Sequence, residues 1–189
     1  MATGTCTPSC IAGRRQETAP TNKYLNKMKS SIQKIKIGIG EGVVAHSPGI
    51  IIAEGLGSCV ALALYNVEHG IGGMAHILLP SSSEYKGRKN AELSPYLYAD
   101  TAIDALLKEL RSQKGTALPN VVAKMVGGAR MFPAYNGVQA GIGEQNITVI
   151  RRILKKMFIP VAGEDVGGSH GRSVEFYVHS GKIIVTVIG

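Results

Sequence analysis

The chain has 189 residues, a formal net charge of +8, and a hydrophobic fraction of 44%. This length suits one domain with a substantial core. No stretch approaches the roughly 18 apolar residues of a membrane span, and the N-terminus lacks the apolar segment of a signal peptide. We therefore expect a cytoplasmic protein with reduced thiols and no membrane insertion.

The positive charge is concentrated near the N-terminus. Residues 1–36 contain seven basic residues against Glu17 alone, whereas the rest of the chain has 14 basic and 12 acidic residues. A basic tail on a nearly neutral body is typical of a solvated extension, so we expect no nucleic-acid partner. The sequence predicts a basic, disordered extension over residues 1–34 and a folded domain over residues 35–189.

In chain order, apolar runs and period-2 alternation predict about eight strands, at residues 35–39, 50–53, 60–66, 73–79, 121–126, 160–163, 173–178 and 183–188. Helical spacing predicts one helix from Ser94-Pro95, an N-cap followed by a first-turn proline, to near Gly115. It predicts a second helix from Gly143 or Glu144 to Met157. This mixed order favours an α+β layered domain.

Cys59 is the only cysteine beyond residue 10, and it ends a tight glycine loop, Gly55-Leu56-Gly57-Ser58-Cys59. A glycine pair leads into His76, 17 residues later. One cysteine and one histidine at neighbouring strand ends are a candidate nucleophile and base. The glycine loop, with Gly57 and Ser58, can direct backbone N–H groups at an oxyanion. The alternative from spacing alone is a buried structural thiol.

No other histidine forms a zinc-ligand spacing with Cys59, so we expect no metal and no cofactor. His170 lies in a polar, glycine-rich loop between two predicted strands and is a candidate pocket residue. A surface position in that loop is the alternative for His170.

Five segments follow one another in order: Gly55–Val60, Gly72–Pro80, Gly127–Phe132, Gly141–Asn146 and the loop from Glu164 to Arg172. Several motifs in the same order are far more specific than any one alone. Together they resemble the CheD family of chemoreceptor glutamine deamidases. The resemblance runs from about Ile35 to the C-terminus.

The resemblance implies an α/β/β/α layered domain of paired mixed sheets, similar to toxin-type cysteine deamidase domains. It implies hydrolysis of glutamine side-chain amides to glutamate on the cytoplasmic domain of a chemoreceptor, in chemotaxis adaptation, with Cys59 as nucleophile and His76 as base. It also implies a CheC-type phosphatase as a partner. A catalytically weak module that binds this partner is the alternative, and a cysteine peptidase or general amidase is a third hypothesis.

One position departs from the family pattern. The family usually has a threonine six residues before the cysteine, thought to orient the histidine, and that position is Ala53 here. A methyl group cannot hydrogen-bond an imidazole, so either another group holds His76 or the activity is weakened. Glu54 is a candidate orienting residue, although neighbours along a strand point to opposite faces.

Overall fold

The computed structural model describes residues 32–83, 94–113, 120–131 and 141–188. The chain divides into two units, Met1–Ser31 and Ile32–Gly189, and the description below concerns the second. The predicted disordered extension over residues 1–34 lies almost wholly outside the described residues.

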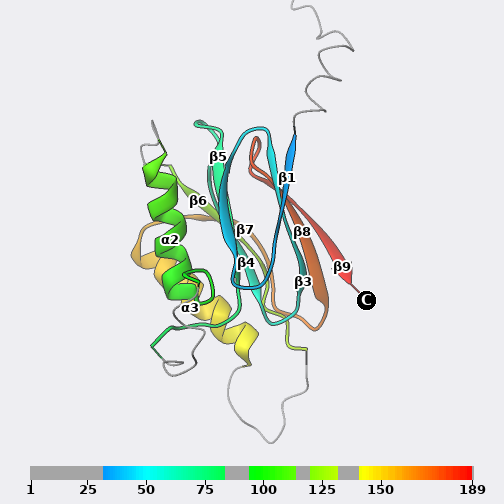
Figure 1. Ribbon diagram of the computed structural model, residues 1–189. Coiled ribbons are helices and arrows are strands. Elements are labelled where there is room, and N and C mark those ends of the chain that lie inside the picture. Colours follow the sequence, from blue (N-terminus) through cyan, green and yellow to red (C-terminus); the bar gives the residue numbers. More distant parts are fainter. Residues whose placement is uncertain (1–31, 84–93, 114–119, 132–140, 189) are drawn as a thin grey trace, which may run out of the picture. The chain divides into compact units, whose positions relative to one another are not determined.

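The described residues form nine strands and two helices (Figure 1). In chain order these are β1 (Gln33–Ile37), β2 (Gly42–His46), β3 (Gly49–Leu56), β4 (Val60–Asn66), β5 (Ile71–Ile77), α2 (Ala99–Ser112), β6 (Val122–Gly127), α3 (Ile142–Lys156), β7 (Val161–Val166), β8 (Gly171–Tyr177) and β9 (Lys182–Ile188).

The strands make two mixed sheets, as predicted. The first has the order β2-β5-β4-β6-β7, and only its β6–β7 pair is parallel. The second has the order β1-β3-β8-β9, and only its β1–β3 pair is parallel.

Two apolar layers hold these elements together. One packs α2 and α3 against the five-stranded sheet and contains Leu62, Leu64, Ile103 and Leu106. The other lies between the two sheets and contains Ile51, Met74 and Phe176. Successive side chains of β4 and β5 point alternately into one layer and the other, which explains why all residues of these two strands are buried.

The predicted α/β/β/α layering is wrong for the described part of the chain, which is layered α/β/β. Both helices lie on the outer face of the five-stranded sheet (Figure 1). On the second sheet, β9 leaves Val187 and Ile188 exposed. The periodicity of a helix predicts which of its faces is buried, but it does not predict which of the two sheets that face packs on.

Two departures from the predicted elements depend on contacts between segments that are distant in the sequence. Ser94 does not cap α2, because its hydroxyl donates to the Gly40 carbonyl and accepts from the Tyr96 N–H, and the helix begins only after Tyr98. Strand β2 was not predicted. It is a short edge strand, and its pairing with β5 defines it.

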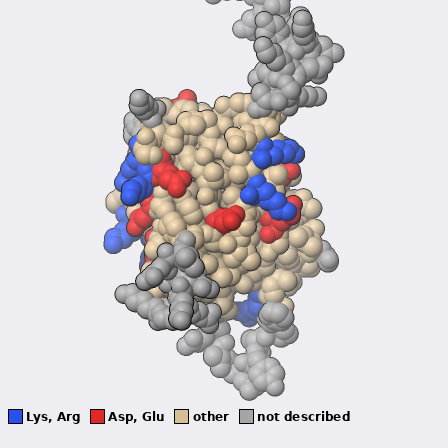
Figure 2. Space-filling view, in the orientation of Figure 1, with Lys and Arg blue, Asp and Glu red and all other residues tan. Residues whose placement is uncertain are grey.

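The described part of the chain contains no helix long and apolar enough to span a membrane. The face of the domain in Figure 2 carries basic and acidic side chains close together, without an extended field of one sign.

Candidate active site

Cys59 lies in the connection between β3 and β4, directly before the first residue of β4. Its side chain is only 6% exposed, and it is a free thiol. It packs in the layer between the sheets together with Ala61 and Ala63, so all three point to the same face of β4.

His76 lies on β5, directly opposite Ala61 in the antiparallel β4–β5 ladder. It therefore faces the same inter-sheet layer as Ala61, and its diagonal neighbour on that face is Cys59. The imidazole is 1% exposed, and neither ring nitrogen has a hydrogen-bond partner among the described residues. The tight turn between β4 and β5 thus brings the predicted nucleophile and base to one end of one sheet face.

Burial sets the protonation of this pair. Desolvation raises the pKa of the Cys59 thiol, and the residue's own backbone N–H, directed at the sulfur, acts in the opposite direction. Desolvation lowers the pKa of His76, partly offset by the negative charge of Glu41. Both shifts favour the neutral forms at neutral pH, so the resting groups are a thiol and a neutral imidazole.

Three consecutive carbonyls anchor the cysteine loop. The Gly57 carbonyl accepts from the Ala129 N–H at 2.8 Å, and the Cys59 carbonyl accepts from the Gly128 N–H at 2.7 Å. Between them, the Ser58 carbonyl accepts from the Asn146 side chain at 3.0 Å. These three carbonyls are therefore held by the residues that follow β6 and by α3.

The N–H groups of the same loop are used differently. The Gly57 N–H donates to the Gly55 carbonyl at 3.0 Å, so this amide is engaged within the loop. The N–H groups of Ser58 and Cys59 have no backbone acceptor within the described residues. Of the two loop residues predicted to hold an oxyanion, Ser58 keeps a free amide and Gly57 does not.

A groove of about 970 Å³ opens beside the loop. Its walls come from the cysteine loop, the β6 terminus, the first turn of α3 and the β7–β8 connection, with Ser58, Ala129, Met131, Ile147 and Gly168 among them. An ion pair between Arg130 and Glu144, at 3.0 Å, stands at its wall.

Ala53 and Glu54 occupy opposite faces of β3, as strand geometry predicts. Ala53 is fully buried between the sheets, where His76 also faces. The Glu54 carboxylate is half exposed and forms an ion pair with Lys36 at 2.5 Å. Glu54 therefore points away from the imidazole, which corrects the idea that it orients His76.

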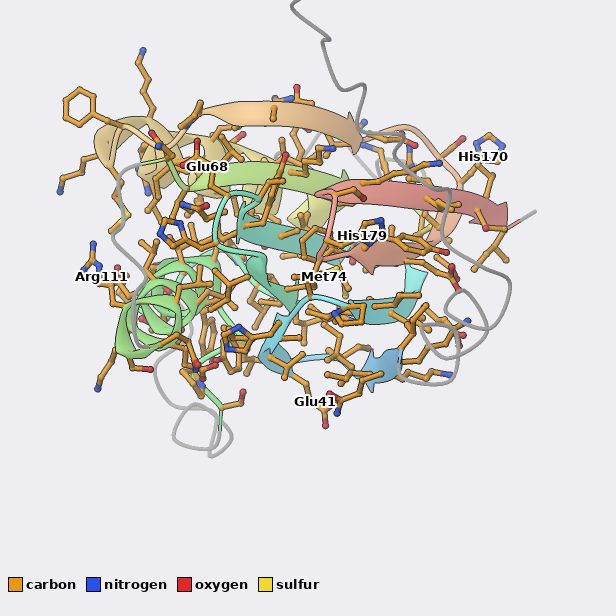
Figure 3. The ribbon with its side chains drawn as sticks, turned by 90° about the horizontal axis from the view of Figure 1, so that it is seen from above. Glu41, Glu68, Met74, Arg111, His170 and His179 are labelled. Carbon is orange, nitrogen blue, oxygen red and sulfur yellow. The ribbon has the colours of Figure 1, made fainter. Side chains whose placement is uncertain are left out.

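His170 is exposed in the short connection between β7 and β8, and among the described residues its ring has a polar contact with the Ser169 hydroxyl, at 3.5 Å. Figure 3 shows it projecting from the periphery of the domain, with Met74 in the interior. His170 is not among the residues that line the groove. The geometry thus favours a surface position for this histidine.

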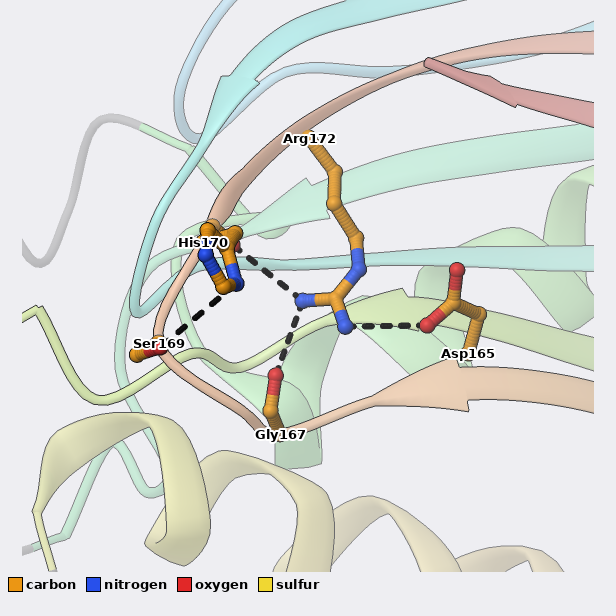
Figure 4. Close-up of polar contacts among 5 residues, drawn as sticks. All are labelled: Asp165, Gly167, Ser169, His170 and Arg172. Carbon is orange, nitrogen blue, oxygen red and sulfur yellow. Dashed lines mark hydrogen bonds and ion pairs between the residues drawn. The ribbon is translucent and has the colours of Figure 1, made fainter. Parts of the chain in front are cut away.

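Arg172 holds the β7–β8 connection in place, and its side chain is only 10% exposed. Its guanidinium donates to the Gly167 carbonyl at 2.8 Å, to the His170 carbonyl at 3.3 Å and to Asp165 at 2.9 Å (Figure 4). Because Gly167 also donates to the Gly127 carbonyl, this network fixes one wall of the groove.

Sequence reasoning missed two residues near the pair. Glu41 holds the β5 backbone at His76, whose N–H donates to the Glu41 carbonyl at 2.9 Å, and its carboxylate raises the imidazole pKa. Asn146 is fully buried in α3 and reaches the cysteine loop. The periodicity of α3 could have flagged Asn146, because a polar residue stands there next to the apolar face.

Within the described residues, no group of three or more histidine, cysteine or acidic side chains could hold a metal ion.

Residues 78–187 match the family model described as CheD, chemotactic sensory transduction. The chain is 37% identical over 163 residues to a probable chemoreceptor glutamine deamidase CheD of Caldanaerobacter subterraneus subsp. tengcongensis, covering 86% of this chain and 96% of the relative. The chain belongs to the CheD family.

Two further CheD relatives are as similar. The probable chemoreceptor glutamine deamidase CheD 2 of Geobacter metallireducens is 41% identical over 156 residues, covering 82% of this chain and 93% of the relative. The Thermococcus kodakarensis CheD, also a probable chemoreceptor glutamine deamidase, is 39% identical over 150 residues, covering 79% and 90%. The CheD model match begins after Cys59 and His76, but an alignment over 163 of 189 residues spans both.

Proposed function

We propose that the chain is a protein-glutamine deamidase that converts glutamine side chains of a chemoreceptor cytoplasmic domain to glutamate during chemotaxis adaptation. The observation that carries this proposal is the placement of Cys59 and His76 on one buried face of the β4–β5 ladder, next to Ser58, which lines a groove. The family and the names of its relatives supply the substrate class.

In the first half-reaction, the thiol of Cys59 attacks the carboxamide carbon while His76 takes the thiol proton. The new C–S bond gives a tetrahedral oxyanion, which the N–H groups of Cys59 and Ser58 can stabilise. One such donor contributes about 3–4 kcal/mol in hydrolases. His76 then protonates the nitrogen, the C–N bond breaks, and ammonia leaves a thioester.

In the second half-reaction, water attacks the thioester carbon and His76 accepts its proton. The C–S bond breaks, the sulfur regains a proton, and glutamate is released. Because burial favours a neutral thiol and a neutral imidazole, His76 acts as a general base during attack and does not hold a preformed ion pair.

A catalytically weak module that binds a CheC-type phosphatase is the second candidate. It is favoured by one specific observation: Ala53 offers no hydroxyl, and neither nitrogen of His76 has a partner in the described part of the chain. An imidazole without an orienting hydrogen bond samples both tautomers and several ring angles, which lowers the fraction ready to act as base.

Mass spectrometry of a chemoreceptor cytoplasmic fragment incubated with the protein separates these candidates. Deamidase activity predicts a mass gain of about one dalton at particular glutamines, lost with Cys59→Ala and with His76→Ala. No gain, combined with intact binding of a CheC-type phosphatase, would favour the binding module and contradict the deamidase.

A further inference from the structure

Asn146 joins the two chain segments that carry the proposed nucleophile and base. Its side-chain Nδ2 donates to the Ser58 carbonyl and to the Leu78 carbonyl, each at 3.0 Å. Ser58 immediately precedes Cys59, and Leu78 follows His76 by two residues. One fully buried amide group therefore bridges both sides of the site.

The position of this bridge is at the end of the sheet ladder. The last β4–β5 pair is Val60 with Ile77, so continuing the register by one residue would place Cys59 opposite Leu78. The Leu78 N–H turns away and donates to the Leu97 carbonyl at 3.1 Å. The Asn146 amide thus takes the place of backbone pairing where the site begins.

Neighbouring contacts make the bridge rigid. In the same helical turn, Gly143 packs so closely on the Gly128 carbonyl that a Cβ there would lie 2.4 Å from its oxygen. Gly128 in turn donates to the Cys59 carbonyl. The first turn of α3 therefore reaches the cysteine loop by two routes, and Asn146 extends this hold to Leu78, just after the histidine strand.

We propose that Asn146 is a positioning residue, which sets the separation and orientation of the Cys59 thiol and the His76 imidazole. This inference rests on the proposed function, since it assigns Asn146 a role in that reaction. Asn146 Oδ1 is buried without a partner among the described residues. Such an unsatisfied group costs stability, which fits an amide retained for geometry.

The test uses the full chain with Asn146→Ala and Asn146→Asp, the second of which keeps the volume but lacks the two N–H donors that bind both carbonyls. Asn66→Ala is the matched control. Asn66 is also a buried asparagine whose Oδ1 accepts from a backbone N–H, and it ends β4 roughly 23 Å from Cys59 along the strand. Folded fraction by circular dichroism, kcat and KM on a receptor fragment, and iodoacetamide alkylation of the Cys59 peptide are measured.

For the folded Asn146 variants we expect kcat to fall roughly 10- to 100-fold with little change in KM, since displacement by about 1 Å can cost 10²-fold. Asn66→Ala should lower stability and leave kcat within about twofold of the unsubstituted protein. His76→Ala should slow alkylation in the unsubstituted chain and have no further effect in the Asn146→Asp background.

The alkylation cycle needs no receptor, so it reads the positioning role even if the receptor is not deamidated. In that case the proposed function fails and the coupling of His76 to Cys59 is still measured. Unchanged kcat and unchanged coupling in the folded Asn146 variants would overturn the positioning role. So would loss of folded protein in both variants, which would assign Asn146 to stability alone.

Discussion

Substituting Gly127 by alanine should disturb the cysteine loop directly, because this glycine packs against the backbone of Cys59. Gly127 has φ +112°, and a Cβ there would lie 2.3 Å from the Cys59 carbonyl oxygen. A side chain in a positive-φ backbone costs about 1–2 kcal/mol, and overpacking adds typically 1–3 kcal/mol. We therefore expect a loss of roughly 2–5 kcal/mol in the free energy of unfolding.

Two further variants separate the backbone cost from the clash. Gly55 has φ +70° and open space around it, so Gly55→Ala should cost only the backbone share, roughly 1–2 kcal/mol. Gly163 in β7 would meet only Lys124, at 3.7 Å, so Gly163→Ala should be neutral or slightly stabilising.

Urea denaturation measures the change in the free energy of unfolding for each of the three variants, from the shift in the denaturation midpoint. The carbonyl displaced by Gly127→Ala belongs to the proposed nucleophile, so deamidation by the folded variant should also fall. A midpoint for Gly127→Ala equal to that of Gly163→Ala would refute the close packing of β6 on the cysteine loop.

Because burial lowers the pKa of His76, the acid limb of kcat/KM should lie below about pH 6.5, and a limb above that value would contradict the assignment of the base. Below about pH 6.5, His76 binds a proton in the unfolded chain but stays neutral in the folded protein. The melting temperature should therefore fall as the pH falls, and the fall should be smaller in His76→Gln. Arg172→Met should cost about 1–3 kcal/mol in urea unfolding, because it removes the hydrogen bonds of a buried charged group to the Gly167 carbonyl and to Asp165. Arg151→Met, which breaks a half-exposed ion pair, should cost at most about 1 kcal/mol, and equal losses would count against the Arg172 network. Ala53→Thr should raise kcat severalfold in initial-rate assays, whereas an unchanged kcat would show that orientation of the imidazole is not limiting.

The sequence predicted the elements that are strongly patterned. Strand β4 has the predicted bounds. The alternation along β3 also held, with Ala53 inside and Glu54 outside. In each case a local pattern of apolar residues or glycine is sufficient, because burial repeats every second residue in a strand.

What the sequence could not predict depends on contacts between distant residues. Strand β2 and the late start of α2 depend on pairing and hydrogen bonds to distant segments, such as that of Ser94 with Gly40. The placement of both helices on one sheet is likewise a tertiary property. Asn146 contacts residues 88 and 68 positions away, and no local pattern predicts such a bridge.

The central claim is that Cys59 is the nucleophile of a glutamine deamidation, and trapping the intermediate tests it most directly. A reaction with a receptor fragment, quenched in acid within one turnover, is digested and mapped by mass spectrometry. The account predicts a receptor peptide, lighter by one ammonia, joined to the Cys59 peptide as a thioester and absent with Cys59→Ser. Deamidated receptor formed by Cys59→Ser at the unsubstituted rate, or an adduct on another residue, would contradict it.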